Sequence, residues 1–387
     1  MNQCRFVSLA SLASCLTFAP LGADRPVPLE EGSRGKPYAN DVAYEVLFHY
    51  TLLGYAMYSD AFSAVAELWK EIKVFDEAPS EPTFLQARHA WQTSRLAYDR
   101  TEVFRFPRSP IEEENLEELI NAWDVQAGVV EADIIGDPDA FPEISRQVLV
   151  QLSRSPEAPG VVTGWHVVEF LLWGPVGTER DARLTKFTDD GLADRRRAFL
   201  RAAMDLLVFH IGRVRGDWEE ENYDNFAGAF LMERQDVVLG AVFTGISTLT
   251  REVMAGERLR APLADNDPAQ LLSRYSDTTT DDLLANLEGL KSIYGGTYVT
   301  SHGRPVTGDG FKVLVASVDA ALAEALDAAL ENATAKVEAI PRPLGIVLAE
   351  GDPAERATVI AAAEALEAVS DLTERAKVVL GVDDQTF

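Results

Sequence analysis

The segment DVAYEVLFHYTLLGYAMYSDAFSAVAELWKEIKVF (residues 41–75) sets the fold class. Its apolar residues recur every three or four positions, which places them on one face of a helix. The segment contains no proline, whereas the stretch APSEPTF (78–84) that follows it contains two. Because proline disrupts a helix interior, the sequence predicts one long amphipathic helix that ends before this stretch.

The same helical period dominates the rest of the chain. Further helices are predicted from about Thr83 to Phe106 and over residues 195–218, 232–259, 311–340 and 353–381. Strand-like alternation is scarce, and no turn-flanked pairs of β-branched runs suggest hairpins. The sequence therefore predicts an all-α fold, and the long helices of its C-terminal half suit a four-helix bundle.

A stretch without hydrophobic period, GPVGTERDARLTKFTDDG (174–191), is the best candidate for a domain boundary. We expect an N-terminal helical domain over residues 38–184 and a C-terminal four-helix bundle over residues 185–387. Residues 24–37 are charged and rich in proline and glycine, which is typical of a linker.

The first 23 residues resemble an export signal, with Arg5, an apolar run and small residues near the end. Two processing routes fit this segment. Cleavage after Ala23 would release a periplasmic protein, whereas LASC (12–15) resembles a lipobox that would leave Cys15 lipidated, giving an outer-membrane or cell-surface lipoprotein. Both cysteines of the chain lie in this segment, so the rest has no disulfide or thiolate metal site. No later stretch is expected to span a bilayer.

The composition narrows the classes of partner. The chain has 387 residues, 47% of them hydrophobic, and a formal net charge of −27. A surface this acidic repels phosphate backbones and anionic lipids, which argues against nucleic acid as a partner and limits membrane contact to a lipid anchor. Cations would be attracted.

The stretch TGWHVVEFLLWG (163–174) has helical apolar stripes on more than one face, so a buried helix is expected. His166 and Glu169 are three residues apart and share a face of it. A buried carboxylate is costly unless it is paired, hydrogen-bonded or bound to metal. Imidazole and carboxylate ligands suit iron, zinc or manganese. The alternative is an internal hydrogen bond between the two side chains.

The second predicted helix carries polar residues on an apolar stripe. The stripe consists of Phe84, Ala87, Trp91, Arg95, Tyr98, Glu102 and Phe106. Glu102 is a candidate third metal ligand, Tyr98 a hydrogen-bonding neighbour and Arg95 a counter-charge. An internal salt-bridge network is the alternative interpretation.

Common catalytic motifs are missing from the sequence. There is no HExxH, and the inverted form HxxEH fails because Phe170 follows Glu169. There is also no GxSxG elbow and no phosphate-binding GxxxxGK[ST] loop. A zinc peptidase needs about three protein ligands and a general base, and one HxxE helix supplies neither in full.

The sequence resembles the imelysin family. Gly164, His166 and Glu169 match its GxHxxE signature, and with four more blocks they make five blocks in the family's order. These blocks are residues 87–106, with the Trp–Arg–Tyr–Glu pattern of Trp91, Arg95, Tyr98 and Glu102, and residues 120–126, 244–259 and 275–296. DTTTDD (277–282) departs from the family's usual Ser-Asp-Asn-Thr run, which puts a role for Thr278–Thr280 in doubt.

The resemblance implies an exported two-domain helical protein linked to bacterial iron uptake, with a site near the domain junction. We therefore expect binding of iron or another divalent or trivalent cation, free or as a chelate, by His166, Glu169 and Glu102. Gly164 would allow close packing where the helix begins. Envelope iron-uptake proteins are the expected partners. The alternatives are a metallopeptidase, an activity also ascribed to the family, and a non-catalytic envelope interaction module.

Overall fold

The computed structural model describes residues 41–154, 160–219 and 224–382. The predicted export signal, the lipobox ending at Cys15 and the linker at 24–37 lie outside the described residues. Within them the chain is 74% helical, with sixteen α-helices and almost no strand, so the all-α prediction is confirmed.

The first part of the chain contains eight α-helices and two irregular helical segments. In order they are α1 (Asp41–Glu77), α2 (Glu81–Asp99), the 3₁₀ segment η2 (Arg100–Phe104), α3 (Pro110–Glu113), α4 (Glu117–Ile120), the π-type segment η3 (Val129–Ile135), α5 (Arg146–Arg154), α6 (Trp165–Trp173), α7 (Arg180–Thr188) and α8 (Ala193–Asp217). The predicted long first helix is α1, and its end coincides with the proline-containing stretch.

The second part adds eight α-helices and one small hairpin. They are α9 (Phe226–Met232), α10 (Gln235–Thr248), the π-type segment η4 (Leu249–Arg260), α11 (Ala261–Asp265), the 3₁₀ turn η5 (Pro268–Gln270), α12 (Thr279–Gly295), the antiparallel strands β1 (Thr297–Val299) and β2 (Pro305–Thr307), α13 (Phe311–Ala316), α14 (Ala320–Glu338), α15 (Leu344–Glu350) and α16 (Pro353–Leu380).

Local signals explain several helix ends. A capping box between Ser80 and Thr83 begins α2. One helix was predicted over 311–340, but the structure divides it because the Asp319 side chain accepts from the Leu322 N–H at 2.9 Å and starts α14. Gly381, in the left-handed conformation, ends α16.

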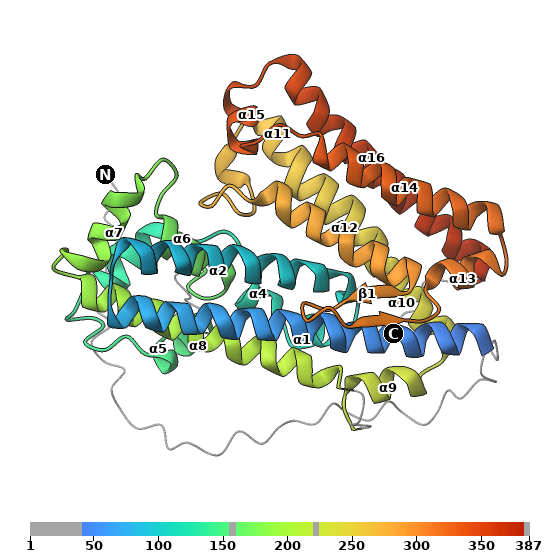
Figure 1. The fold of residues 1–387 in the computed structure, drawn as a ribbon, viewed down its shortest axis with the longest axis horizontal. Helices are drawn as coiled ribbons and strands as arrows, with labels where there is room; N and C mark the ends of the chain where they lie inside the picture. Colours follow the sequence, from blue (N-terminus) through green and yellow to red (C-terminus); the bar gives the residue numbers. More distant parts are fainter. Residues whose placement is uncertain (1–40, 155–159, 220–223, 383–387) are drawn as a thin grey trace, which may run out of the picture.

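The helices α1, α2 and α8 run side by side as one layer (Figure 1). Apolar side chains of α1 such as Leu53, Met57 and Val65 are fully buried in the packing of this layer. The sequence placed α8 at the start of the C-terminal domain. The structure instead packs it against α1 and the shorter helices α5, α6 and α7, because its apolar face meets theirs. The second layer begins later in the chain than residue 185.

The second layer consists of the long helices α12, α14 and α16 with the continuous helix α10–η4 (Figure 1). Contacts run from α10 and η4 to α16, from α16 to α14, and from α14 to α12. Their closure into a four-helix bundle stays a prediction. In addition, α12 packs against α2 and η2 of the first layer, which forms the junction between the layers.

In the described part of the chain, one helix is long and apolar enough to span a membrane. It is Gln235–Asp265, with a mean hydropathy of 1.3 over its most apolar window. In the structure 67% of that window is buried inside the protein. Packing against α16 thus accounts for its apolar character, because a core helix needs the same composition.

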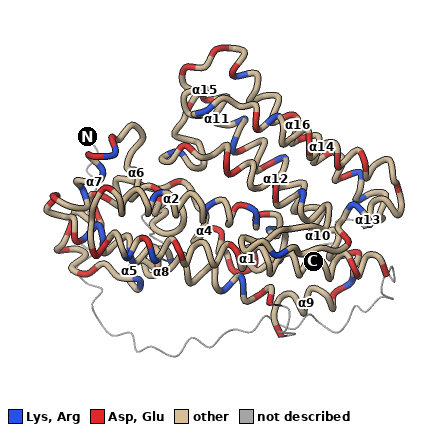
Figure 2. The backbone as a smooth tube through the Cα atoms, in the orientation of Figure 1, with Lys and Arg blue, Asp and Glu red and all other residues tan. Residues whose placement is uncertain are grey.

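Figure 2 shows acidic positions spread along helices of both layers rather than gathered in one place.

Candidate functional site

The HxxE helix α6 begins with a glycine that no other residue could replace without strain. Gly164 has φ +93°, and a Cβ built on it would lie 2.5 Å from the Ile120 carbonyl oxygen. This is the close approach that the sequence predicted for Gly164, and it brings the start of α6 tightly against the end of α4. From Trp165 to Leu172 the helix is buried on every side.

Two arginines hold the other end of α6. The Arg88 guanidinium donates to the Leu172 carbonyl at 2.9 and 3.2 Å. Arg183 donates to the carbonyls of Leu171 at 2.8 Å and Phe170 at 3.0 Å. The last carbonyls of a helix lack internal donors and carry partial negative charge, so cations here stabilise the helix end. No sequence spacing links these arginines to α6, because Arg88 lies on α2 and Arg183 on α7.

The structure brings His166 and Glu169 together. The imidazole Nδ1 lies 2.8 Å from Glu169 Oε2, and both side chains are fully buried. The other carboxylate oxygen, Oε1, accepts from the Tyr275 N–H at 3.0 Å, the Ser276 N–H at 2.7 Å and the Ser276 hydroxyl at 2.7 Å. Glu169 thus ties α6 to the loop before α12, across the junction.

Burial and these contacts determine which atoms of His166 and Glu169 carry protons. Burial, together with the neighbouring Arg95 charge, lowers the pKa of His166 well below its usual value, so the imidazole is neutral. Burial raises the pKa of Glu169 to about 7, opposed by the hydrogen bonds from Ser276. Above that pH the carboxylate only accepts, so Nδ1 carries the imidazole proton. Nε2 then presents a lone pair, and among the described residues this buried atom has no hydrogen-bond partner.

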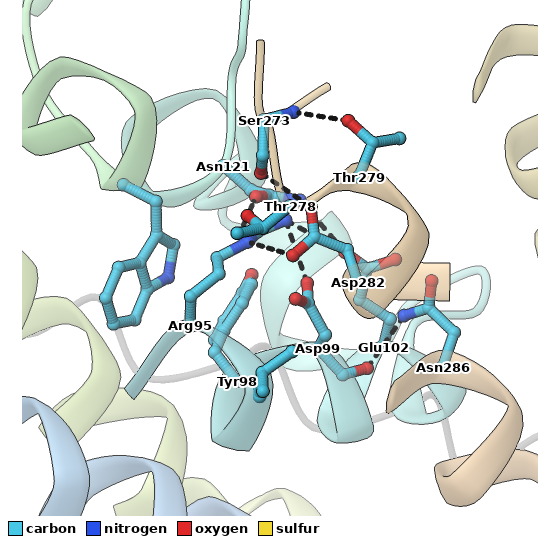
Figure 3. Close-up of polar contacts among 12 residues, drawn as sticks. Arg95, Tyr98, Asp99, Glu102, Asn121, Ser273, Thr278, Thr279, Asp282 and Asn286 are labelled. Carbon is cyan, nitrogen blue, oxygen red and sulfur yellow. Dashed lines mark hydrogen bonds and ion pairs between the residues drawn. The ribbon is translucent and has the colours of Figure 1, made fainter. Parts of the chain in front are cut away.

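Beside the pair lies a buried cluster centred on Arg95, shown in Figure 3. The Arg95 guanidinium lies 2.8 Å from the Asp99 carboxylate and 3.8 Å from Asp282, and it donates to the Asn121 side chain. Asp282 belongs to α12 and also accepts from the Ser273 hydroxyl at 2.5 Å. Arg95 is therefore the counter-charge of Asp99 and Asp282.

The structure does not bring Glu102 to the His–Glu pair as a third ligand. The Glu102 carboxylate accepts from Arg258 of η4 at 2.8 and 3.0 Å and from the Asn121 amide at 3.0 Å. Across the described ranges, no group of three histidine, cysteine or acidic side chains is placed to hold a metal ion. The expected set of three metal ligands, His166, Glu169 and Glu102, is thus not assembled. Glu102 instead forms an ion pair with Arg258 of η4, which is distant in sequence.

The remaining two predicted neighbours contact α6 through its first residue. The Trp91 indole N–H donates to the Trp165 carbonyl at 3.1 Å. The Tyr98 ring packs against the Trp165 ring, with centroids 5.7 Å apart, and its hydroxyl donates to Glu117 at 3.4 Å. Both residues position the start of the HxxE helix.

The cluster contains more acidic than basic groups. Four carboxyl groups, on Asp99, Glu102, Glu169 and Asp282, and two guanidinium groups, on Arg95 and Arg258, are each at most 5% exposed. Burial raises the pKa of Asp99 and of Asp282, which means that protons offset part of the excess. One oxygen of Asp282, Oδ1, has no hydrogen-bond partner among the described residues.

Comparison with known proteins identifies the family. The sequence model of the Imelysin family matches residues 54–373. A relative named iron-regulated protein A, from Synechococcus elongatus, is 24% identical over 328 residues, which cover 82% of this chain and 81% of the relative.

Two solved structures share the fold. One is an iron-regulated protein A precursor from Parabacteroides distasonis, with a TM-score of 0.69, 14% identity and coverage of 92% of this chain and 98% of that one. The other is an imelysin-like protein from Psychrobacter arcticum, with a TM-score of 0.65, 17% identity and coverage of 90% and 98%. Since the sequence model spans most of the chain, this protein belongs to the imelysin family.

Proposed function

We propose that this chain is an exported protein of iron uptake or homeostasis that binds a divalent cation through His166 Nε2. The main support for the proposal is that His166 Nε2 is buried and has no hydrogen-bond partner among the described residues. The other ring nitrogen, Nδ1, lies 2.8 Å from the Glu169 carboxylate. Histidines that bind metals commonly donate their second ring N–H to a carboxylate, which fixes the tautomer and the ring orientation. In this interpretation Glu169 positions His166 instead of binding the metal itself.

The charge and the donor types of the cluster fit such a cation. An excess of two buried carboxyl groups matches the charge of a divalent ion, which would take the place of protons. Asp282, whose charge acts on His166, is the carboxylate that would join it, and water or a chelator would supply the other ligands, since the described residues place no group of three such side chains around a metal ion. Nitrogen and carboxylate ligands suit iron, manganese and zinc.

Iron is the first candidate because the Synechococcus relative is named an iron-regulated protein. An exported location, as a periplasmic protein or as a lipoprotein attached through Cys15, would place the chain among envelope iron-uptake proteins. The peptidase alternative receives less support, because both Glu169 oxygens already accept hydrogen bonds and neither is free to activate water.

The test is the metal content of protein purified without chelator and then equilibrated with iron(II), manganese or zinc. His166→Gln is expected to bind the preferred metal at least ~10-fold more weakly than the wild type, because loss of even an orienting neighbour costs metal sites about 10–100-fold in affinity. His302→Gln, in the exposed hairpin loop, is the matched control and should retain wild-type affinity.

Equal metal affinity in the wild type and both variants would contradict the proposal. If His166→Gln lowers only the thermal stability, and no protein binds metal, the pair serves to hold the two layers together and the interaction-module alternative is favoured.

A further inference from the structure

A second, separate site lies between α5, α8 and the loop that precedes α6. It is a cavity of about 20 Å³ with apolar walls that include Val150 and Leu206 and a polar side formed by Ser153, Thr163 and His210. The exposed Arg154 also lines it. A volume of this size admits one or two water molecules or a single small ion.

One lining residue, His210, has an unsatisfied polar atom, its Nδ1 nitrogen. The side chain is only 6% exposed, and Nδ1 has no hydrogen-bond partner in the described part of the chain. Burial, with the nearby Arg146, Arg213 and Arg154, lowers the pKa of His210 to about 4. The imidazole is therefore neutral near pH 7 and can donate from Nδ1.

The hydroxyl groups of the lining already donate elsewhere. The Thr163 hydroxyl donates to the Leu119 carbonyl at 3.2 Å, and the Ser153 hydroxyl donates to the Leu149 carbonyl at 2.9 Å. The donors that remain for an occupant of the cavity are thus the His210 imidazole and the Arg154 guanidinium.

The electrostatic surroundings of the cavity are positive, in contrast to the chain as a whole. Among the described residues, no acidic side chain lines the cavity. Arg213 is paired with Glu114, and Asp205 partly offsets Arg146. The Arg154 guanidinium is thus the charged group that lines the cavity. The positive charges of Arg146, Arg213 and Arg154 all lower the pKa of His210. A small anion is favoured over a cation by this field.

We propose that this cavity binds a halide ion, with chloride as the physiological example, through the His210 Nδ1–H and the Arg154 guanidinium. The small volume and the apolar walls favour a compact monatomic anion over a tetrahedral oxyanion such as phosphate. An anion here would lie next to Thr163, one residue before the strained Gly164 that starts α6. The proposal does not depend on metal binding at His166.

The test combines crystals soaked in sodium bromide with thermal unfolding in sodium chloride and in sodium gluconate at equal ionic strength. In the wild type we expect an anomalous bromide peak in the cavity, within hydrogen-bonding distance of Nδ1, and a higher unfolding midpoint in chloride. His210→Phe should lose the peak and the chloride effect. Arg304→Gln, a surface charge far along the chain in the hairpin loop, should keep both.

If His210→Phe does not fold, Arg154→Gln replaces it, and its halide affinity is expected to fall. A wild-type cavity that contains only water after the bromide soak would overturn the proposal. An unfolding midpoint that rises equally in chloride for the wild type and for the cavity variants would overturn it too, because the ion would then act elsewhere.

Discussion

Replacement of Glu169 by alanine is expected to lower the free energy of unfolding by about 3–5 kcal/mol, because it removes the acceptor of several hydrogen bonds at once and each buried donor left unsatisfied costs about 1–3 kcal/mol. The side chain accepts from two backbone N–H groups and one hydroxyl of Tyr275 and Ser276, and it faces the His166 imidazole. Alanine would remove the acceptor of the two backbone N–H groups and of the imidazole N–H, whereas the Ser276 hydroxyl would keep its contact with the Thr278 hydroxyl at 3.0 Å. Urea denaturation followed by helical circular dichroism measures the loss.

The matched control is Glu169→Gln, which keeps the shape and one accepting oxygen. Because the donors of Tyr275 and Ser276 are fixed, the amide oxygen must face them and the amide N–H₂ must face His166 Nδ1. This variant should lose only about 1–2 kcal/mol, within the range for one altered hydrogen bond at a buried site. An alanine variant as stable as the glutamine variant would show that these contacts contribute little.

Arg258→Met is expected to produce a loss of similar size, about 3–5 kcal/mol, because it removes the nearest cation of the buried Glu102 carboxylate and leaves only Arg95, 4.0 Å away, in the buried cluster. Arg258 donates to Glu102 at 2.8 and 3.0 Å and to the Asn286 side chain at 2.7 Å. These contacts join η4, η2 and α12, so the loss should appear as weaker association of the two layers. The free energy of unfolding measures it.

A double variant, Arg258→Met with Glu102→Leu, tests the cause. If the loss comes from an unpaired charge, removal of that charge should restore part of the stability, since apolar replacements of buried ion pairs are often tolerated. The two single losses should then exceed the loss of the double variant by about 1–3 kcal/mol, the usual range of coupling between contacting residues. Simple addition of the two losses would contradict this explanation.

The helical architecture could be predicted from sequence because it depends on local signals. The apolar period and the prolines after residue 77 define α1, and the observed helix Asp41–Glu77 follows them closely. The placement of α8 could not be predicted in this way. Its amphipathic pattern shows that one side of α8 is buried. The pattern does not show which layer covers that side, because packing against either layer requires the same apolar face.

The candidate site could be predicted only in part, for a similar reason. His166 and Glu169 lie on one helix, so their proximity follows from spacing. Asp282 and Arg258 reach the cluster from α12 and η4, and Ser276 from the loop between them. No spacing rule connects residues more than a hundred positions apart. The i, i+4 spacing of Arg95 and Asp99 is a local signal that could have indicated this ion pair.

The central claim is that Glu169 holds the His166 ring with Nδ1 protonated and Nε2 free for a metal. Nitrogen-15 NMR of histidine-labelled protein at pH 8, with His166→Gln for assignment, tests it most directly. The wild type should show the Nδ1–H tautomer for His166, and zinc should shift the Nε2 signal alone. Glu169→Gln should show the Nε2–H tautomer and no response to zinc. A proton on Nε2 in the wild type, or an unchanged Nε2 signal with zinc present, would contradict the account.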